Sequence, residues 1–83
     1  MASHLQLMAR GIAVAARRLE REGIDPLECE PTEALAMLQY HPGPIGTWAT
    51  GCNYAEFDCW ISMWNGYRWM RGWYQRRETD ATG

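Results

Sequence analysis

Four side chains in this sequence have the chemistry to bind a transition metal: Cys29, His41, Cys52 and Cys59. Thiolate sulfur and imidazole nitrogen are the ligands that zinc prefers, but structural zinc sites usually take them from closely spaced pairs such as Cys-x-x-Cys. The sequence contains no such pair. We therefore predict buried free cysteines and no bound metal, and the odd cysteine count also argues against a disulfide framework.

The residues that could carry out catalysis are few and poorly placed. The two histidines, His4 and His41, do not have the spacing of a metalloprotease helix or of a nucleophile–base pair. Glu56 and Asp58 are two residues apart, so they would point away from each other on a helix. Ser62 has no base near it in the sequence. We therefore predict a protein that is not an enzyme and needs no cofactor.

Binding chemistry is concentrated in residues 53–77, which hold four of the five tryptophans, three of the four tyrosines and the only phenylalanine. At 100° per residue, the apolar side chains of this stretch form two groups. We expect the larger group to face the core; it contains Phe57, Trp60, Met63, Trp64, Tyr67, Met70 and Tyr74. Trp69 and Trp73 lie almost opposite, on a side that also carries Ala55, Cys59, Ser62 and Gly66.

Two interpretations of Trp69 and Trp73 stay open. They could form a docking surface, because Trp, Tyr and Arg dominate the energetics of protein interfaces. They could instead be covered by residues 41–52 or by the N-terminal helix, and a bend at a helical glycine would change the side they face. We take Trp69, Trp73 and the following Arg76 and Arg77 as candidate partner-binding residues.

A second candidate surface lies near the N-terminus. Arg10, Arg17 and Arg21 fall within about 40° of one another on a helix. Such a strip could contact anions, either RNA phosphates or an acidic partner. The net charge of −2, with eight arginines and no lysine, favours a solvated face instead and argues against a general nucleic-acid binder.

Local signals place these residues on helices. Ser3 and Gln6 form a capping-box pattern that begins a helix over 4–22, and Gly23 ends it. Asp25-Pro26-Leu27-Glu28 predicts a single turn, and Pro31 begins a second helix over 31–40.

The second half of the chain contains the longest helix. Residues 41–52, rich in Gly, Pro and Thr, are expected to form a loop whose Trp48 closes the core. Asn53 and Glu56 repeat the capping pattern and begin a helix over 54–77. The polar residues 78–83 are expected to fray.

These elements predict an all-α single domain over 1–83, with about three helices and the aromatic C-terminal helix at its centre. Period-two alternation is too short anywhere to predict a strand. The sequence has no apolar run of membrane-spanning length and no signal-peptide pattern at its start. We therefore expect a cytoplasmic protein that does not enter a membrane.

Two short elements resemble a known family. Cys52-Asn53-Tyr54 followed by Trp69-Met70-Arg71-Gly72-Trp73 resembles the end of ribosome modulation factor and its relatives, short bacterial and phage proteins with a Cys/Asn-Pro-Tyr element and then Trp-x-x-Gly-Trp. Here Asn53 replaces the proline, the intervening segment is longer, and the chain is acidic rather than strongly basic. The resemblance implies a small helical protein that binds ribosomal RNA and proteins, and it adds Tyr54 and Gly72 to the candidate positions.

Together the patterns predict a small non-enzymatic binding protein that docks on a larger protein or complex and modulates or inhibits it. Phages and other mobile elements use such proteins against host machinery. One alternative is a modulator of ribosomes or RNA of the ribosome modulation factor type. The other is a self-associating structural protein, a homodimer, in which the surface around Trp69 and Trp73 pairs with itself.

Overall fold

Four α-helices and one 3-10 turn make up the structure. In chain order they are α1 (His4–Arg21), η1 (Pro26–Glu28), α2 (Pro31–Leu38), α3 (Pro44–Gly51) and α4 (Tyr54–Thr82). The computed structural model describes residues 3–82 and the side chains of residues 3–78, and that part of the chain contains no strand. The all-α class is confirmed, but the helices number four rather than about three.

The first helix follows its sequence signals closely. The Gln6 amide donates to Ser3 Oγ at 3.2 Å, and the Ser3 amide donates to Gln6 Oε1 at 2.8 Å, which completes the capping box. After the last turn Gly23 adopts a φ of 75°, and the Ile24 amide donates to the Leu19 carbonyl at 2.9 Å. This left-handed glycine is a common way to end a helix.

The next two elements also match the prediction. Asp25 Oδ1 accepts a hydrogen bond from the Leu27 amide at 3.0 Å, so the residue directly before η1 caps this turn. Pro31 occupies the first turn of α2. This helix ends at Leu38, two residues before the expected boundary at 40.

The expectation of a loop over 41–52 is wrong, because this segment contains α3. Its composition is poor in helix-forming residues, and burial of Ile45, Trp48 and Ala49 stabilises it instead. Gly46 is essential to its packing, since a Cβ there would collide with the His41 carbonyl. Trp48 closes the core as expected.

The last helix begins as predicted. The Glu56 amide donates to Asn53 Oδ1 at 2.8 Å, and the Asn53 amide donates to Glu56 Oε1 at 3.4 Å. The helix continues unbroken to Thr82, into the stretch expected to fray. Fraying of residues 78–83 stays a prediction, and Gly83 lies outside the described residues.

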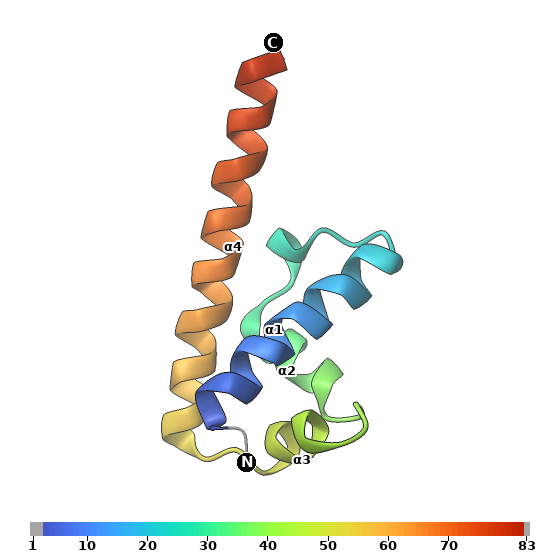
Figure 1. Ribbon diagram of the computed structural model, residues 1–83, viewed down its shortest axis with the longest axis vertical. Coiled ribbons are helices and arrows are strands. Elements are labelled where there is room, and N and C mark those ends of the chain that lie inside the picture. Colours follow the sequence, from blue (N-terminus) through green and yellow to red (C-terminus); the bar gives the residue numbers. More distant parts are fainter. Residues whose placement is uncertain (1–2, 83) are drawn as a thin grey trace.

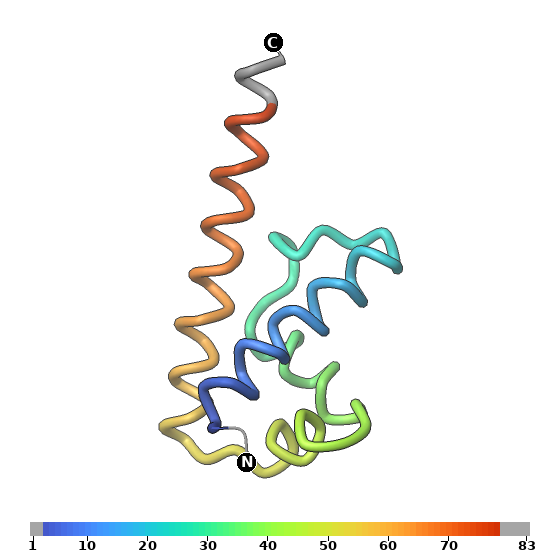
Figure 2. Tube along the Cα trace, in the orientation of Figure 1, coloured from blue at the N-terminus to red at the C-terminus, as the bar shows by residue number. Residues whose placement is uncertain are grey.

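Helix length explains the shape of the molecule. The 29 residues of α4 span about 43 Å, close to the longest dimension of 45 Å, whereas the other two dimensions are 24 and 22 Å. α1, α2 and η1 pack against α4 along one side, and its C-terminal part projects beyond them (Figures 1 and 2). None of the described helices has the length and apolar character needed to cross a membrane.

This projection overturns part of the predicted core face. Trp60 and Trp64 are fully buried, and Phe57, Met63 and Tyr67 are half-buried around them. Met70 and Tyr74 share their side of the helical wheel but are 52% and 56% exposed. Met70 lies at the edge of this face, and Tyr74 follows Arg71 and Gly72, the residues that contact α1 and η1.

Candidate functional site

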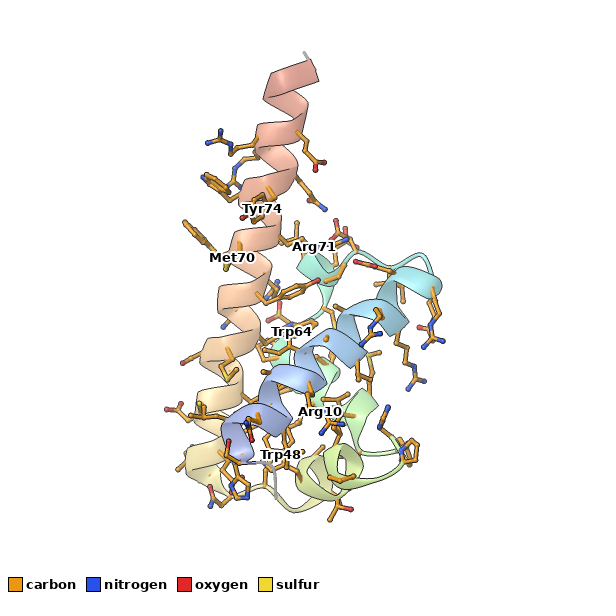
Figure 3. All side chains as sticks on the ribbon, in the orientation of Figure 1. Arg10, Trp48, Trp64, Met70, Arg71 and Tyr74 are labelled. Atoms are coloured by element: carbon orange, nitrogen blue, oxygen red, sulfur yellow. The ribbon has the colours of Figure 1, made fainter. Side chains whose placement is uncertain are left out.

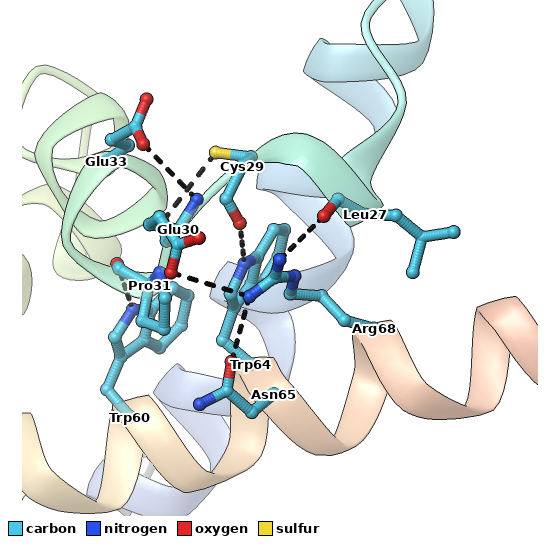
Figure 4. A network of polar contacts seen from close by, with 9 residues as sticks. All are labelled: Leu27, Cys29, Glu30, Pro31, Glu33, Trp60, Trp64, Asn65 and Arg68. Atoms are coloured by element: carbon cyan, nitrogen blue, oxygen red, sulfur yellow. Dashed lines mark hydrogen bonds and ion pairs between the residues drawn. The ribbon is translucent and has the colours of Figure 1, made fainter.

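Three buried indoles fix the rotation of α4 about its axis. Trp60 Nε1 donates to the Pro31 carbonyl at 2.8 Å and Trp64 Nε1 donates to the Cys29 carbonyl at 2.7 Å (Figure 4). Their rings stack at a centroid distance of 5.9 Å, and the Trp48 ring packs against Trp60 at the same distance. Because buried indole N–H groups need partners, these bonds set which side of α4 faces outward.

Glu56 links the start of α4 to the start of α1 and to α3. Its Oε2 accepts a hydrogen bond from Trp48 Nε1 at 2.6 Å and lies 2.7 Å from His4 Nδ1. The same carboxylate caps α4 through the Asn53 amide. Sequence reasoning identified the cap but not the contacts with His4 and Trp48, which depend on tertiary structure.

Arg68 and Gly72 hold the middle of α4 against η1. Arg68 Nη2 donates to the Leu27 carbonyl at 2.6 Å, and Nη1 donates to Asn65 Oδ1 at 3.1 Å and pairs with Glu30 at 3.6 Å (Figure 4). A Cβ on Gly72 would lie 3.6 Å from Leu27 Cδ2, in ordinary van der Waals contact. Gly72 is therefore a packing position in this structure.

Arg71 ties the start of the projecting segment to α1. Its Nη1 lies 2.8 Å from Glu20 Oε1 and donates to the Tyr67 hydroxyl at 3.3 Å. In Figure 3 it lies between α4 and the neighbouring elements. Burial by itself lowers the pKa of Arg71, but Tyr67 and Glu20 outweigh it, so that the pKa is raised and the guanidinium stays charged.

On both sides of this anchor in the sequence, four large apolar side chains are exposed on α4. We call Trp69, Met70, Trp73 and Tyr74 the outer aromatic patch; Trp69 is 67% exposed and Trp73 is 37% exposed. The Trp73 and Tyr74 rings meet edge to face at 5.0 Å. The Arg77 guanidinium lies 4.8 Å from the centre of the Trp73 ring, at the distance of a cation–π contact.

The structure shows whether other parts of the chain cover Trp69 and Trp73. Both are exposed, and α3, which replaces the expected loop, packs on α1 and α2 rather than over them. Neither tryptophan contacts another aromatic ring of the core. The interpretation that residues 41–52 or the N-terminal helix cover these two side chains is therefore wrong.

Most of the predicted partner-binding residues lie together on this segment. Arg76 and Arg77 follow the patch, and both are exposed. Tyr54 is 88% exposed at the other end of α4, roughly 22 Å from Trp69 along the helix axis. One rigid partner surface of small size could not contact Tyr54 and the patch together.

The arginine strip of α1 forms a separate surface. Arg10, Arg17 and Arg21 are all exposed, as a strip on one side of a helix requires. Arg17 and Arg21 line an open depression of about 560 Å³ together with Val14, Glu20 and His41. The Glu20 carboxylate offsets part of the positive charge there, which weakens the case for an anion site.

The cysteines are free thiols. Burial raises the pKa of the Cys29 thiol, and the nearby Glu33 carboxylate adds to the effect. Burial also raises the pKa of Cys52, with Glu56 contributing. A raised pKa reduces the thiolate fraction at neutral pH, which lowers reactivity. Within the described residues, no group of three or more His, Cys, Asp or Glu side chains could hold a metal ion.

Comparison of the chain with family models, curated proteins and solved structures gave no match.

Proposed function

We propose that the protein is a non-enzymatic binding protein that docks on a larger protein or complex through the outer aromatic patch and modulates or inhibits it. One observation carries the proposal: four large apolar side chains are exposed next to one another on a helix that extends past the rest of the fold. Contiguous exposed apolar surface on a small protein commonly marks an interaction site.

The energetics suit docking. Each aromatic side chain can remove about 150–250 Å² from water, and Trp, Tyr and Arg are the residues most often found at interface hot spots. Trp73 is already held by Tyr74 and Arg77, so less side-chain entropy is lost on binding. The side chains are also carried on a preformed helix, which a hydrophobic groove on a partner can accept.

The chemistry of the partner follows from the residues beside the patch. Arg76 and Arg77 are exposed there and make no ion pair with another residue whose side chain the structure describes. A matching partner presents an apolar groove with carboxylates at its rim. With α4 in that groove, α1, α2 and α3 would remain outside it and could block access to the partner's surface, which is how a small protein of a phage or mobile element could inhibit a cytoplasmic host protein.

The test is capture of partners from a host lysate by matched variants. We expect the wild-type chain and Tyr54→Ala to retain the same partner, because Tyr54 is exposed but distant from the patch. Trp69→Ala combined with Trp73→Ala should lose that partner while keeping the helical circular dichroism spectrum. If the double variant captures the same proteins as the wild type, the patch is not the docking site.

A second candidate function is a ribosome-associated modulator, supported by the exposed strip Arg10, Arg17 and Arg21. Contacts with phosphate release counterions, so they weaken steeply as salt rises. Sedimentation with ribosomes at two salt concentrations tests this candidate. Binding that is lost in high salt and in Arg17→Gln/Arg21→Gln supports it, whereas binding that depends only on Trp69 and Trp73 supports docking through the patch.

A further inference from the structure

The side of α4 that faces away from the other helices follows a regular spacing. From Ala55 onward, steps of four and three residues lead through Cys59, Ser62 and Gly66, and then through Trp69, Trp73 and Arg76. This is the spacing of a coiled-coil contact. Cys59 is half-buried and the others are exposed. We call these seven residues the outer seam.

The outer seam divides into a small half and a large half. The positions from Ala55 to Gly66 carry small side chains, and a Cβ on Gly66 would meet nothing within 4 Å. The positions from Trp69 to Arg76 carry large ones. A surface with a row of hollows followed by a row of projections is complementary to a copy of itself turned end to end.

Antiparallel pairing of two seams matches each large residue with a small one. Placing Trp69 of one copy opposite Gly66 of the other also places Trp73 opposite Ser62 and Arg76 opposite Cys59. The two-fold axis then repeats every contact, as an isologous interface requires. Parallel pairing in register would instead place tryptophan on tryptophan and glycine on glycine, which overfills some layers and leaves voids in others.

Charge favours the same arrangement. Asp58 and Arg76 are 18 residues apart, five full turns of 3.6 residues, so they point in the same direction from α4. In the antiparallel pair, Asp58 of one copy lies beside Arg76 of the other, and the opposite contact repeats it. Both side chains are exposed in the single chain. Parallel pairing would bring like charges together.

The outer seam is also long and unobstructed. It extends over about 32 Å from Ala55 to Arg76, and α1, α2 and η1 pack on the other side of α4. Figure 1 shows that side of α4 free along its length. Four tryptophans, two from each copy, would enter the contact. Two copies can therefore meet along the helix without any change in the packed helices.

We infer that the free protein is an antiparallel dimer whose two α4 helices pair along the outer seam. The inference goes beyond docking on a larger protein, because it identifies a second copy of this chain as the occupant of Trp69 and Trp73. A larger partner that binds the same tryptophans would have to displace that copy. Dimer dissociation would then precede docking.

The first experiment measures mass by sedimentation from micromolar to hundreds of micromolar protein. We expect the wild-type chain to form dimers and Gly66→Ala to retain them. Gly66→Trp should raise the dissociation constant about 100-fold or more, because two layers become overfilled by symmetry. Adding Trp69→Ala to Gly66→Trp restores one large and one small residue per layer and should recover most of the affinity.

The second experiment tests the register with a native thiol. In Arg76→Cys, mild oxidation should join the new thiol to Cys59 of the other copy, and peptide mapping should find that disulfide. Gln75→Cys is the matched control. It lies on the side of α4 that faces the other helices and should not cross-link. Oxidation of the wild-type chain to a Cys59–Cys59 dimer would show parallel pairing and overturn the inference.

Other outcomes are equally decisive. A wild-type chain that stays monomeric throughout refutes the dimer, as does a Gly66→Trp variant that dimerises like the wild type. Neither result affects docking on a larger protein, which the lysate capture tests separately. If both proposals hold, monomeric Gly66→Trp should capture the larger partner at least as well as the wild-type chain.

Discussion

The two halves of α4 each carry a pair of tryptophans four residues apart, and the pairs have opposite fates. Trp60 and Trp64 are fully buried and stacked, and they donate hydrogen bonds to the carbonyls of Pro31, the first residue of α2, and of Cys29, just before it. Trp69 and Trp73 are exposed. Nine residues separate the corresponding members of the two pairs, which is two and a half turns. The same side chain thus builds the core or a binding surface according to its phase on the helix.

The largest expected difference between the halves is in stability. Trp60→Ala and Trp64→Ala should each cost about 3–5 kcal/mol, because each removes a buried ring and leaves a carbonyl without its donor. Together they should unfold a chain whose total stability lies near 5–15 kcal/mol. Trp69→Ala with Trp73→Ala should cost less than about 1 kcal/mol.

Urea denaturation followed by circular dichroism at low protein concentration measures both pairs, since dimer formation would otherwise add to the apparent stability. Equal losses from the two pairs would show that Trp69 and Trp73 are structural, and the division of α4 into a core half and a binding half would fail.

The next effect concerns the boundary between the halves, where Arg68 binds the Leu27 carbonyl and Asn65. Arg68→Met keeps much of the apolar stem but removes these donors, and we expect a loss of about 1–3 kcal/mol in the free energy of unfolding. Arg77→Met on the outer half removes only an exposed cation–π contact and should cost less than about 1 kcal/mol. Thermal melts followed by circular dichroism measure both variants. Equal melting temperatures would mean that the buried indoles of Trp60 and Trp64 position α4 without help from Arg68.

Local chemistry made much of this fold predictable from the sequence. The capping residues Ser3 and Asn53 and the turn at Asp25 depend only on neighbours a few residues away, and each behaves as expected. α3 was not predictable in this way, because packing of Trp48 and the close approach at Gly46 stabilise a segment with weak helix propensity. Tertiary contacts outweighed composition there.

The candidate site shows a different limit of sequence reasoning. A helical wheel repeats along the whole of α4, whereas the 18-residue α1 ends after about 27 Å. The wheel therefore assigned Met70 and Tyr74 to the core, although the shorter elements leave both side chains exposed. The direction of Trp69 and Trp73 could be predicted. Their exposure could not, because it depends on whether α1 or the segment with α3 covers them.

Two glycines provide a smaller comparison between the inner and outer surfaces. Gly66→Ala should stabilise the chain by about 0.5–1 kcal/mol, because the new Cβ meets open space and alanine is a better helix former. At Gly11, where α1 crosses the core, a Cβ would come 2.9 Å from Leu38 Cδ1 and 3.4 Å from a Trp60 ring atom. Gly11→Ala should therefore destabilise the chain. Thermal melts that shift in the same direction for both variants would contradict the assigned surfaces.

The smallest expected effect is a pH dependence on the inner side, at Cys29. Burial raises the pKa of this thiol, with Glu33 adding to the shift, so the folded chain holds the proton more tightly than the unfolded chain. The resulting stabilisation is complete below the ordinary thiol pKa of about 8.5 and is lost as the pH rises above it. Cys29→Ala should therefore lose less stability than the wild type between neutral and alkaline pH, as measured by urea midpoints. The Cys29 carbonyl accepts a hydrogen bond from the buried Trp64 indole. Parallel pH profiles for the two proteins would therefore mean that the surroundings of Cys29 are more open to water than this contact implies.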